Sequence, residues 1–586
     1  MTTEPMPREA RINGPAEPDI RVELRWRVFA VALVAVSAVT SAAWLIHPPV
    51  YLTNDDVAIR LVLEGGFVPA QPSTGFVLHA HSVLGWALVS LYGIVPDAPW
   101  WDLVIAGTLF WALAVLCALA WPALGSGWPA RVTALSAICA ASLPLIGTLQ
   151  YTFSATAAGV AGTLLVATES APAARTRRSV LVMAALLFVM GSLVRPMGAL
   201  AGALSVGLLL MPLAAVTRPA PRAGVVRLAA VLLVAALAFT GLRSLDGALY
   251  GRWPDWNQYY LYNWMTARMF EWGGEFTGAR VDAIRASVGW SANDWQMLRW
   301  GWAVTPELHG FLRVVTAYET GSTLLGWSDR LGWFATRLLA IDGMSLRRLG
   351  EASAELVLVG GTLAAAYGNW RSRATVALVV ALFLGFCVGV EVGFKEAPFR
   401  LLAPLECGFL AVMLVSAGAH RRVPSPFVSL LGLSVVLAVL AHEGRAVASS
   451  MAAERLHALQ VDKEMERLRD LKPSLVVRHS DTFPAEHWWR PFHQPAIPLA
   501  IITLGGNVQA FSQHPQLQRF LSDTGRQPLL RALCGDPSIL VVSELGRLDM
   551  VTTYFQEHEN RQVRWEEAYA GSFRAWRCVG ATSSAS

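Results

Sequence analysis

Two adjacent carboxylates, Asp55 and Asp56, follow the first long apolar run and precede an amphipathic stretch. Ionisable groups at the edge of a membrane are costly unless they are hydrated or used in function. In one interpretation they open a solvated helix, with Asn54 or Asp55 as the N-cap and Asp56 in the favourable first turn. In the other, Asp55 is a general base and Asp56 assists it, by orienting the acceptor or as a ligand of a hard cation such as Mg²⁺, Mn²⁺ or Ca²⁺. Adjacent side chains at a helix start point about 100° apart, so one of the two would face a cavity.

Three basic residues lie close to prolines that interrupt the apolar pattern. Arg195 directly precedes Pro196, which breaks a helical pattern between two apolar runs. Lys395 and Arg400 flank Pro398 in the segment EVGFKEAPFR. Each cation is either an anchor at the membrane interface or a binder of an anionic group such as phosphate.

The segment 244–352 is rich in Trp and Tyr and has the pattern of amphipathic helices that lie along a membrane surface. Trp256, Tyr259 and Tyr260 are candidate substrate-binding residues, because aromatic rings with polar groups stack on sugar rings. An interfacial aromatic belt is the alternative. Asp294, in a run that has the form of a helix start, is a fourth candidate.

Helices that span a membrane must position these residues. Hydrophobic residues make up 54% of the 586 residues and charged residues 15%. Soluble globular proteins carry about 25% charged residues, and disordered chains combine low hydrophobicity with high net charge, so both classes are excluded. Since a spanning helix needs about 20 mostly apolar residues, the sequence predicts an α-helical polytopic membrane protein with about ten to thirteen transmembrane helices. The candidate runs are 28–46, 76–95, 102–121, 131–149, 152–168, 180–195, 198–214, 225–243, 354–368, 374–393, 399–417 and 426–442.

Arginine clusters at the ends of these runs predict the orientation, because short cytoplasmic loops are enriched in Lys and Arg. The basic residues form no patch, which argues against a nucleic-acid partner. If every run is a full crossing, Arg175 falls on the outer face, which conflicts with the cytoplasmic location of the other arginine clusters. The prediction therefore assigns an odd number of crossings to 131–168. The predicted organisation is a disordered cytoplasmic N-terminus 1–26, a transmembrane domain 27–442 with outer loops 48–75 and 244–352, and an extracytoplasmic domain 443–586.

The C-terminal segment 443–586 predicts a small α/β domain on a polar helical stalk at 445–471. Its last part, 562–579, has the pattern of two strands. Cys534 and Cys578 lie in this domain, where an oxidising compartment permits a bridge, and two buried thiols are the alternative. The other four cysteines lie in apolar runs and are interpreted as small buried hydrophobes.

This arrangement resembles the GT-C superfamily of membrane glycosyltransferases, including the multi-pass proteins of bacterial surface-polysaccharide clusters. The shared features are an inside N-terminus, an outer loop that opens with an Asp pair, many spans, a second large outer loop and an outer C-terminal domain. The resemblance covers about residues 28–440 and is carried by Thr53 to Asp56, His79 to Trp101, Arg195-Pro196, Ser291 to Trp295 and Lys395 to Arg400.

The resemblance implies a polyprenyl-phosphate sugar as donor and a cell-envelope glycan or lipid as acceptor, in the bacterial cytoplasmic (inner) membrane. An acidic residue of the first outer loop, here Asp55 or Asp56, would take the proton of the acceptor hydroxyl. Arg195, Lys395 and Arg400 would hold the donor phosphate. Apart from a divalent cation, no cofactor is expected.

Two other function classes fit the same composition. One is a transporter or flippase of a lipid-linked saccharide, and the other is a non-catalytic protein of envelope assembly. Transporters tend to carry internal repeats with broken midplane helices, and no clear repeat is evident in this sequence. The charges near the membrane also cluster at the outer ends of the runs, which favours chemistry at the outer surface.

Overall fold

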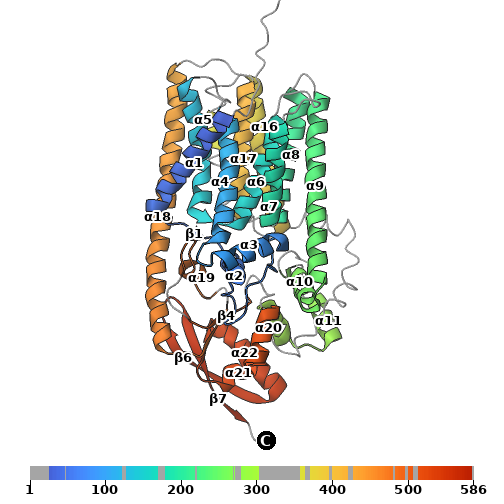
Figure 1. Ribbon diagram of the computed structural model, residues 1–586, viewed down its shortest axis with the longest axis vertical. Helices are drawn as coiled ribbons and strands as arrows, with labels where there is room; N and C mark the ends of the chain where they lie inside the picture. Colours follow the sequence, from blue (N-terminus) through green and yellow to red (C-terminus); the bar gives the residue numbers. More distant parts are fainter. Residues whose placement is uncertain are drawn as a thin grey trace, which may run out of the picture.

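The described part of the chain is elongated, with a bundle of long helices standing on a small α/β domain (Figure 1). Short helices fill the zone between the two. The computed structural model describes residues 26–46, 48–121, 127–168, 178–217, 221–267, 270, 279–302, 357–362, 370–394, 399–419, 426–479, 482–494, 499–505 and 512–583.

The bundle is built from apolar helices that run roughly along the long axis of the molecule (Figure 1). Helix α6 is its centre, since it is buried along nearly its whole length and packs against α4, α7, α8 and α17. By contrast, α1 and α9 expose most of their apolar windows, with 17% of the residues buried against 94% in α6. A bilayer would cover these exposed apolar faces. The bounds are α1 Trp26–Ile46, α4 Trp100–Ala120, α5 Trp128–Gly147, α6 Tyr151–Thr168, α7 Arg178–Val194, α8 Pro196–Thr217, α9 Pro221–Gly251, α16 Trp370–Phe394, α17 Phe399–Ala419 and α18 Pro426–Asp470.

Six helices within the described ranges are long and apolar enough to cross a membrane, namely α1, α4, α5, α6, α9 and α18. Shorter apolar helical stretches lie in α7, α8, α16 and α17. This confirms the predicted fold class, an α-helical polytopic membrane protein. Of the predicted run 354–368, the structure describes only residues 357–362, which are helical.

The predicted span 76–95 is wrong. It forms α3 (Ser82–Ile94), whose 13 residues reach about 20 Å, less than the roughly 30 Å of a bilayer core. The helix cannot start earlier because His81 is its N-cap and accepts a hydrogen bond from the NH of Val83 at 3.1 Å. The preceding loop packs closely on α3, since a Cβ at Gly85 would lie 2.1 Å from the carbonyl oxygen of Gly75. Helix α3 lies across the end of the bundle together with α2 (Asn54–Glu64) (Figure 1).

Because 76–95 is not a span, one crossing fewer precedes Arg175, and the conflict between its position and the other arginine clusters disappears. Strand β1 (Val50–Tyr51) pairs in parallel with β2 (Thr148–Leu149), so the end of α5 lies beside the segment that follows α1. The NH of His81 donates to the carbonyl of Leu193 at 2.9 Å, which places the end of α7 at this same level. The predicted odd number of crossings in 131–168 is therefore wrong, because α5 and α6 are two full helices. Arg178, the first residue of α7, lies at the opposite end, whereas Arg175 is outside the described residues.

Helix α18 links the bundle to the C-terminal domain. The sequence predicted a span at 426–442 and a separate polar stalk at 445–471, whereas the structure forms one continuous helix of 45 residues. It runs down one side of the molecule from the far end of the bundle to the sheet (Figure 1). The C-terminal domain is thus fixed to the same end of the bundle as α2 and α3.

The C-terminal domain confirms the predicted small α/β fold. Its five-stranded sheet has the order β4-β3-β5-β7-β6, with β3, β4 and β5 parallel and β7 antiparallel to its two neighbours. The bridge between Cys534 and Cys578 is formed and ties α21 to β7. The elements are β3 Leu475–His479, α19 Ala485–Trp488, β4 Ile501–Leu504, α20 Pro515–Asp523, α21 Leu529–Gly535, β5 Ile539–Val542, α22 Leu545–Glu559, β6 Arg561–Ala570 and β7 Arg574–Ser583.

Part of the predicted outer loop 244–352 is helical, as its amphipathic pattern indicates. Helix α9 extends to Gly251, further than the predicted run 225–243. It is followed by α10 (Pro254–Thr266), α11 (Ala279–Val288) and α12 (Ala292–Arg299). Helices α10 and α12 pack against α20 and α22 of the C-terminal domain, and α11 lies close to α10 (Figure 1). The C-terminal domain and these helices enclose the end of the bundle that carries α2.

We expect reporter fusions at Arg178 and Trp370 to report a cytoplasmic location and a fusion at Ser584 an extracytoplasmic one. The physical reason is that arginine-rich loops resist translocation, and Arg178 lies at the end of the bundle opposite the C-terminal domain. Paired alkaline phosphatase and green fluorescent protein fusions measure this. A cytoplasmic signal at Ser584 would contradict the orientation.

Candidate active site

Helix α2 brings the two adjacent carboxylates to the end of the bundle that faces the C-terminal domain. It begins after Thr53, whose backbone is extended at φ −140°, and ends at Gly65 in the left-handed region at φ +81°. Asp55 and Asp56 lie in the first turn, where carboxylates interact favourably with the helix dipole. The predicted helix start is confirmed, although its N-cap is Thr53.

Asp55 lines a very small pocket with a volume of about 10 Å³. Its neighbours on the pocket wall are Ala58, Ile59 and Val62 on α2, residues 76–79 in the loop before α3, and Tyr259 on α10. The α2 residues follow the three- and four-residue spacing of one helix face. Asp55 is half-buried, and it lines a small, mostly apolar space.

Asp56 points into the protein and is fully buried. One carboxylate oxygen accepts a hydrogen bond from the backbone NH of Tyr151 at 3.0 Å, and the other accepts one from the hydroxyl of Thr53 at 3.0 Å. Burial raises the pKa of this carboxyl, while the bond from Tyr151 acts in the opposite direction. Asp56 joins the first turn of α2 to the start of α6 and thereby orients the neighbouring Asp55.

Tyr151, the first residue of α6, connects Asp55 to Arg195. Its hydroxyl donates to Oδ2 of Asp55 at 3.4 Å, and it accepts a hydrogen bond from Nη1 of Arg195 at 2.5 Å. The guanidinium also lies over the tyrosine ring, with 4.8 Å between Cζ and the ring centroid. The structure therefore brings together two of the predicted residues, Asp55 and Arg195, through a tyrosine that lies between the predicted runs 131–149 and 152–168 and was not among the predicted site residues.

His79 also lines the Asp55 pocket and has an unusual backbone. Its φ is +73°, in the left-handed region that non-glycine residues rarely adopt. Such strain is tolerated where the surrounding structure fixes it, and it is frequent at functional sites. The ring stacks on that of Tyr151 with 6.5 Å between centroids, so His79 contacts the same tyrosine as Arg195.

The predicted aromatic candidates form one wall near the pocket. Tyr259 is 2% exposed and contributes directly to the pocket lining. Trp256 stacks on Phe76 with centroids 4.8 Å apart, and Tyr260 packs against Tyr250 at the same distance. His514 of the C-terminal domain contacts the rings of Trp256 and Tyr259 at 5.2 and 5.0 Å. These aromatic rings join α10 to the pocket wall and to the C-terminal domain.

A buried ionic network supports α2 from the side opposite the pocket. Arg60 is 1% exposed, and its Nε donates to Oε1 of Glu64 at 2.7 Å. Its Nη1 donates to Oδ2 of Asp102 on α4 at 3.3 Å. The hydroxyl of Tyr51 donates to the other oxygen of Asp102. Since a buried charge needs a partner, this network fixes α2 against β1 and α4.

The C-terminal domain completes the same network. Nη1 of Arg60 also donates to the carbonyl oxygen of Arg490 at 2.9 Å, and the NH of Phe492 donates to Oδ2 of Asp102 at 2.8 Å. The guanidinium of Arg490 pairs with Asp462 on α18 at 3.0 Å. Domain and bundle therefore share one set of buried hydrogen bonds directly behind the candidate base.

The remaining predicted residues lie elsewhere or outside the described part. Lys395 is not among the described residues, and Arg400 lies in the first turn of α17, with its side chain undescribed. Asp294 is 1% exposed and belongs to the capping box of α12 with Ser291. Its Oδ1 lies 2.9 Å from Nε2 of His558 on α22. The contact with His558 thus joins α12 to the C-terminal domain.

No protein-family model and no curated protein matches the chain. Among solved structures it is similar to ArnT from Cupriavidus metallidurans in the apo state and bound to undecaprenyl phosphate, with TM-scores of 0.36 and 0.35. Both comparisons have 14% identity and cover 94% of this chain and 98% of ArnT. ArnT is a glycosyltransferase of the GT-C family, the class that the sequence resembles. A likeness at this TM-score transfers neither a site nor an activity.

Proposed function

We propose that this protein is a membrane glycosyltransferase that moves a sugar from a polyprenyl-phosphate donor to a glycan or lipid acceptor of the cell envelope. The observation that supports it best is the connected set Asp55, Tyr151 and Arg195 at one end of the bundle. It combines a carboxylate that lines a pocket with a guanidinium held two hydrogen bonds away. Proton removal and stabilisation of a leaving phosphate need these two kinds of group.

In the proposed reaction, a carboxylate oxygen of Asp55 takes the proton of the acceptor hydroxyl. The acceptor oxygen attacks the anomeric carbon and forms the new glycosidic bond, while the bond from that carbon to the phosphate oxygen breaks. The electron pair of the broken bond stays on the departing polyprenyl phosphate. Arg195 stabilises this charge, since a guanidinium has five NH donors and the hydrogen bond to Tyr151 engages one nitrogen.

Tyr151 positions both groups. It holds the guanidinium by a hydrogen bond and a cation–π contact, and its hydroxyl donates to Asp55. Tyr259 presents an aromatic wall on which a sugar ring can stack. Lys395 and Arg400 remain predicted ligands of the donor phosphate.

The expected divalent cation also remains a prediction. Asp56 does not fit a metal ligand well, because it is fully buried and both of its oxygens accept hydrogen bonds from protein groups. The proposed reaction therefore includes no divalent cation.

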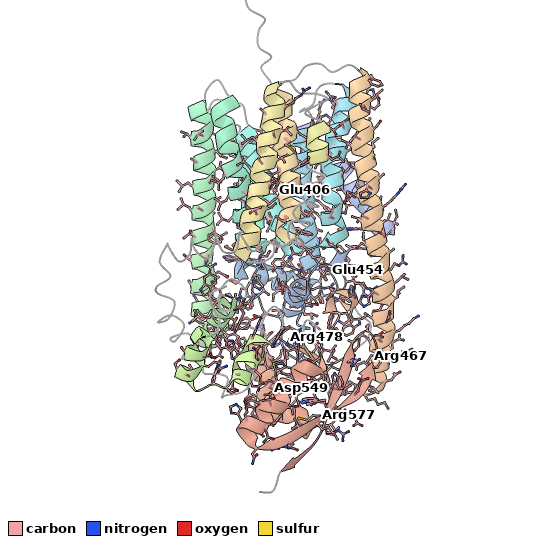
Figure 2. The ribbon with its side chains drawn as sticks, turned by 180° about the vertical axis from the view of Figure 1, so that it is seen from behind. Glu406, Glu454, Arg467, Arg478, Asp549 and Arg577 are labelled. Carbon is pink, nitrogen blue, oxygen red and sulfur yellow. A yellow bond between two sulfur atoms is a disulfide. The ribbon has the colours of Figure 1, made fainter. Side chains whose placement is uncertain are left out.

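A transporter of the lipid-linked saccharide is the second candidate function, and one residue supports it. Glu406 lies on α17 within the bundle, and its Oε1 is buried without a hydrogen-bond partner among the described residues (Figure 2). Ionisable residues inside a membrane often mark transport pathways. However, a larger apolar cavity of about 660 Å³ between α1, α4 and α7 shares no lining residue with the Asp55 pocket. This separation supports surface chemistry over a continuous path.

We expect Arg195→Ala to raise KM for the donor by about 10–100-fold, because a hydrogen bond to a charged group is worth about 1.5–3 kcal/mol. The assay is sugar transfer by purified protein in liposomes, with polyprenyl-phosphate sugars as donors. Arg178→Ala is the matched control, since Arg178 begins α7 at the far end of the bundle. Equal KM values for wild type and Arg195→Ala would remove Arg195 from the donor site.

A further inference from the structure

A cluster of metal-binding side chains lies where α18 leaves the bundle and meets α19. Glu454 and His457 are three residues apart on α18, so they share one face of the helix. His487 on α19 approaches the same face. One potential ligand atom from each of the three lies within 4.8 Å of the others. Figure 2 shows Glu454 on α18 at the level between the helix bundle and the sheet.

The contacts inside this cluster leave polar atoms without hydrogen bonds. Nδ1 of His487 lies 3.0 Å from Oε2 of Glu454, and the rings of His457 and His487 have centroids 4.2 Å apart. Yet Nδ1 of His487 and Oε2 of Glu454 are both buried and make no hydrogen bond of acceptable geometry with any described residue. Oε2 of the neighbouring Glu486 is in the same situation. Unsatisfied buried polar atoms are rare because each is costly, and a cation between His487 and Glu454 would satisfy their two unpaired atoms.

A second cluster in the described residues provides a contrast. Asp294, Glu557 and His558 also meet the distance criterion for a metal site. Here Ser291 donates to Glu557 through its hydroxyl at 2.8 Å and to Asp294 through its NH at 2.9 Å, and Nε2 of His558 lies 2.9 Å from Asp294. Hydrogen bonds already account for this arrangement, so it needs no ion.

We propose that Glu454, His457 and His487 bind one Zn²⁺ ion. Two imidazoles and one carboxylate are a donor set that zinc prefers, and a fourth position remains for water. Oε1 of Glu486 lies 3.7 Å from Nε2 of His487, the ring nitrogen that faces away from Glu454. The side chain of Glu454 is 36% exposed, so the ion can enter from solvent.

The position of the cluster gives the ion a structural role. Helix α19 packs against α2 and β1 as well as α18. The segment just after α19 supplies the carbonyl of Arg490 to Arg60 and the NH of Phe492 to Asp102. Zinc would therefore fix α19 to α18 and stabilise the support behind α2. This inference does not depend on the reaction proposed for Asp55.

The test is a zinc titration of the full-length protein, purified in detergent through an affinity tag without histidines and stripped with a chelator. Competition against a chromophoric chelator should give about one tight site per chain in wild type. His457→Ala and His487→Ala should each weaken this site by at least about 10–100-fold, the range measured for groups that merely support metal ligands. His558→Gln, in the hydrogen-bonded cluster, should bind zinc like wild type.

Two further measurements keep the outcome decisive if a histidine variant folds poorly. Co²⁺ added to the stripped wild type should produce the visible d–d absorption of a four- or five-coordinate site, and Zn²⁺ should abolish it. Zn²⁺ should also raise the thermal unfolding temperature of wild type, with no such rise in the His457→Ala/His487→Ala double variant. Absence of a tight site in wild type, or unchanged affinity in both single variants, would overturn the proposal.

Discussion

Asp55→Asn is expected to reduce sugar transfer by about 10²–10⁴-fold, the usual contribution of a positioned general base. Asparagine keeps the size of the side chain and still accepts the hydrogen bond from Tyr151. It cannot accept the proton of the acceptor hydroxyl. The loss should therefore appear in kcat, with little change in KM for the donor. Initial rates with a polyprenyl-phosphate sugar, at saturating acceptor, measure it.

Two control variants separate this effect from structural damage. Asp56→Asn keeps an oxygen that can accept from the NH of Tyr151, so its loss of activity should be much smaller than that of Asp55→Asn. Glu406→Gln removes the buried carboxyl in α17, and transfer should continue at near the wild-type rate. A rate for Asp55→Asn within a few-fold of wild type would exclude Asp55 as the base.

Arg60→Ala is expected to destabilise the protein by about 3–5 kcal/mol, because it leaves buried carboxylates without their cation. Asp102 is fully buried, and the side chain of Glu64 is 14% exposed. The variant also removes the hydrogen bond from Arg60 to the carbonyl of Arg490, which joins α2 to the C-terminal domain. Thermal unfolding in detergent, followed by tryptophan fluorescence, should shift to clearly lower temperature.

The matched control for this prediction is Arg561→Ala. Arg561 pairs with Glu559 at 3.2 Å, and its side chain is 36% exposed. Partly exposed ion pairs contribute about 0–1 kcal/mol, so its unfolding temperature should stay close to that of wild type. Equal shifts in unfolding temperature in the two variants would show that the buried Arg60 network stabilises the protein no more than a partly exposed ion pair does.

The sequence predicted the helix start at Asp55 and Asp56 from local rules, since short-range capping and dipole effects act within one turn. Which carboxylate faces the pocket depended on long-range contacts. The NH of Tyr151, 95 residues away, engages Asp56 and turns it inward. In the sequence, Tyr151 is one aromatic residue beside an apolar run, so nothing local marks it as the partner of two predicted site residues.

Hydropathy predicted most membrane helices correctly because a spanning helix is defined by its length and its apolar composition, which can be read from the sequence. It misjudged 76–95, where the apolar residues form a loop and a short helix with one buried and one exposed face rather than a span. His81 was the available signal, since an N-cap at that position shortens the helix below membrane length. The pairing of Arg60 with Asp102 joins residues 42 apart and has no local pattern. The two-strand pattern of 562–579, in contrast, directly predicted β6 and β7.

The fate of the donor lipid tests the proposed reaction most directly. Purified protein is placed in liposomes with a polyprenyl-phosphate sugar and an acceptor mixture, and mass spectrometry quantifies the free polyprenyl phosphate that forms. Wild type and Glu406→Gln should accumulate free polyprenyl phosphate in step with glycosylated acceptor, while Asp55→Asn should leave the donor intact. Donor that stays intact with wild-type protein, but moves from one leaflet to the other, would contradict the transferase and identify a transporter.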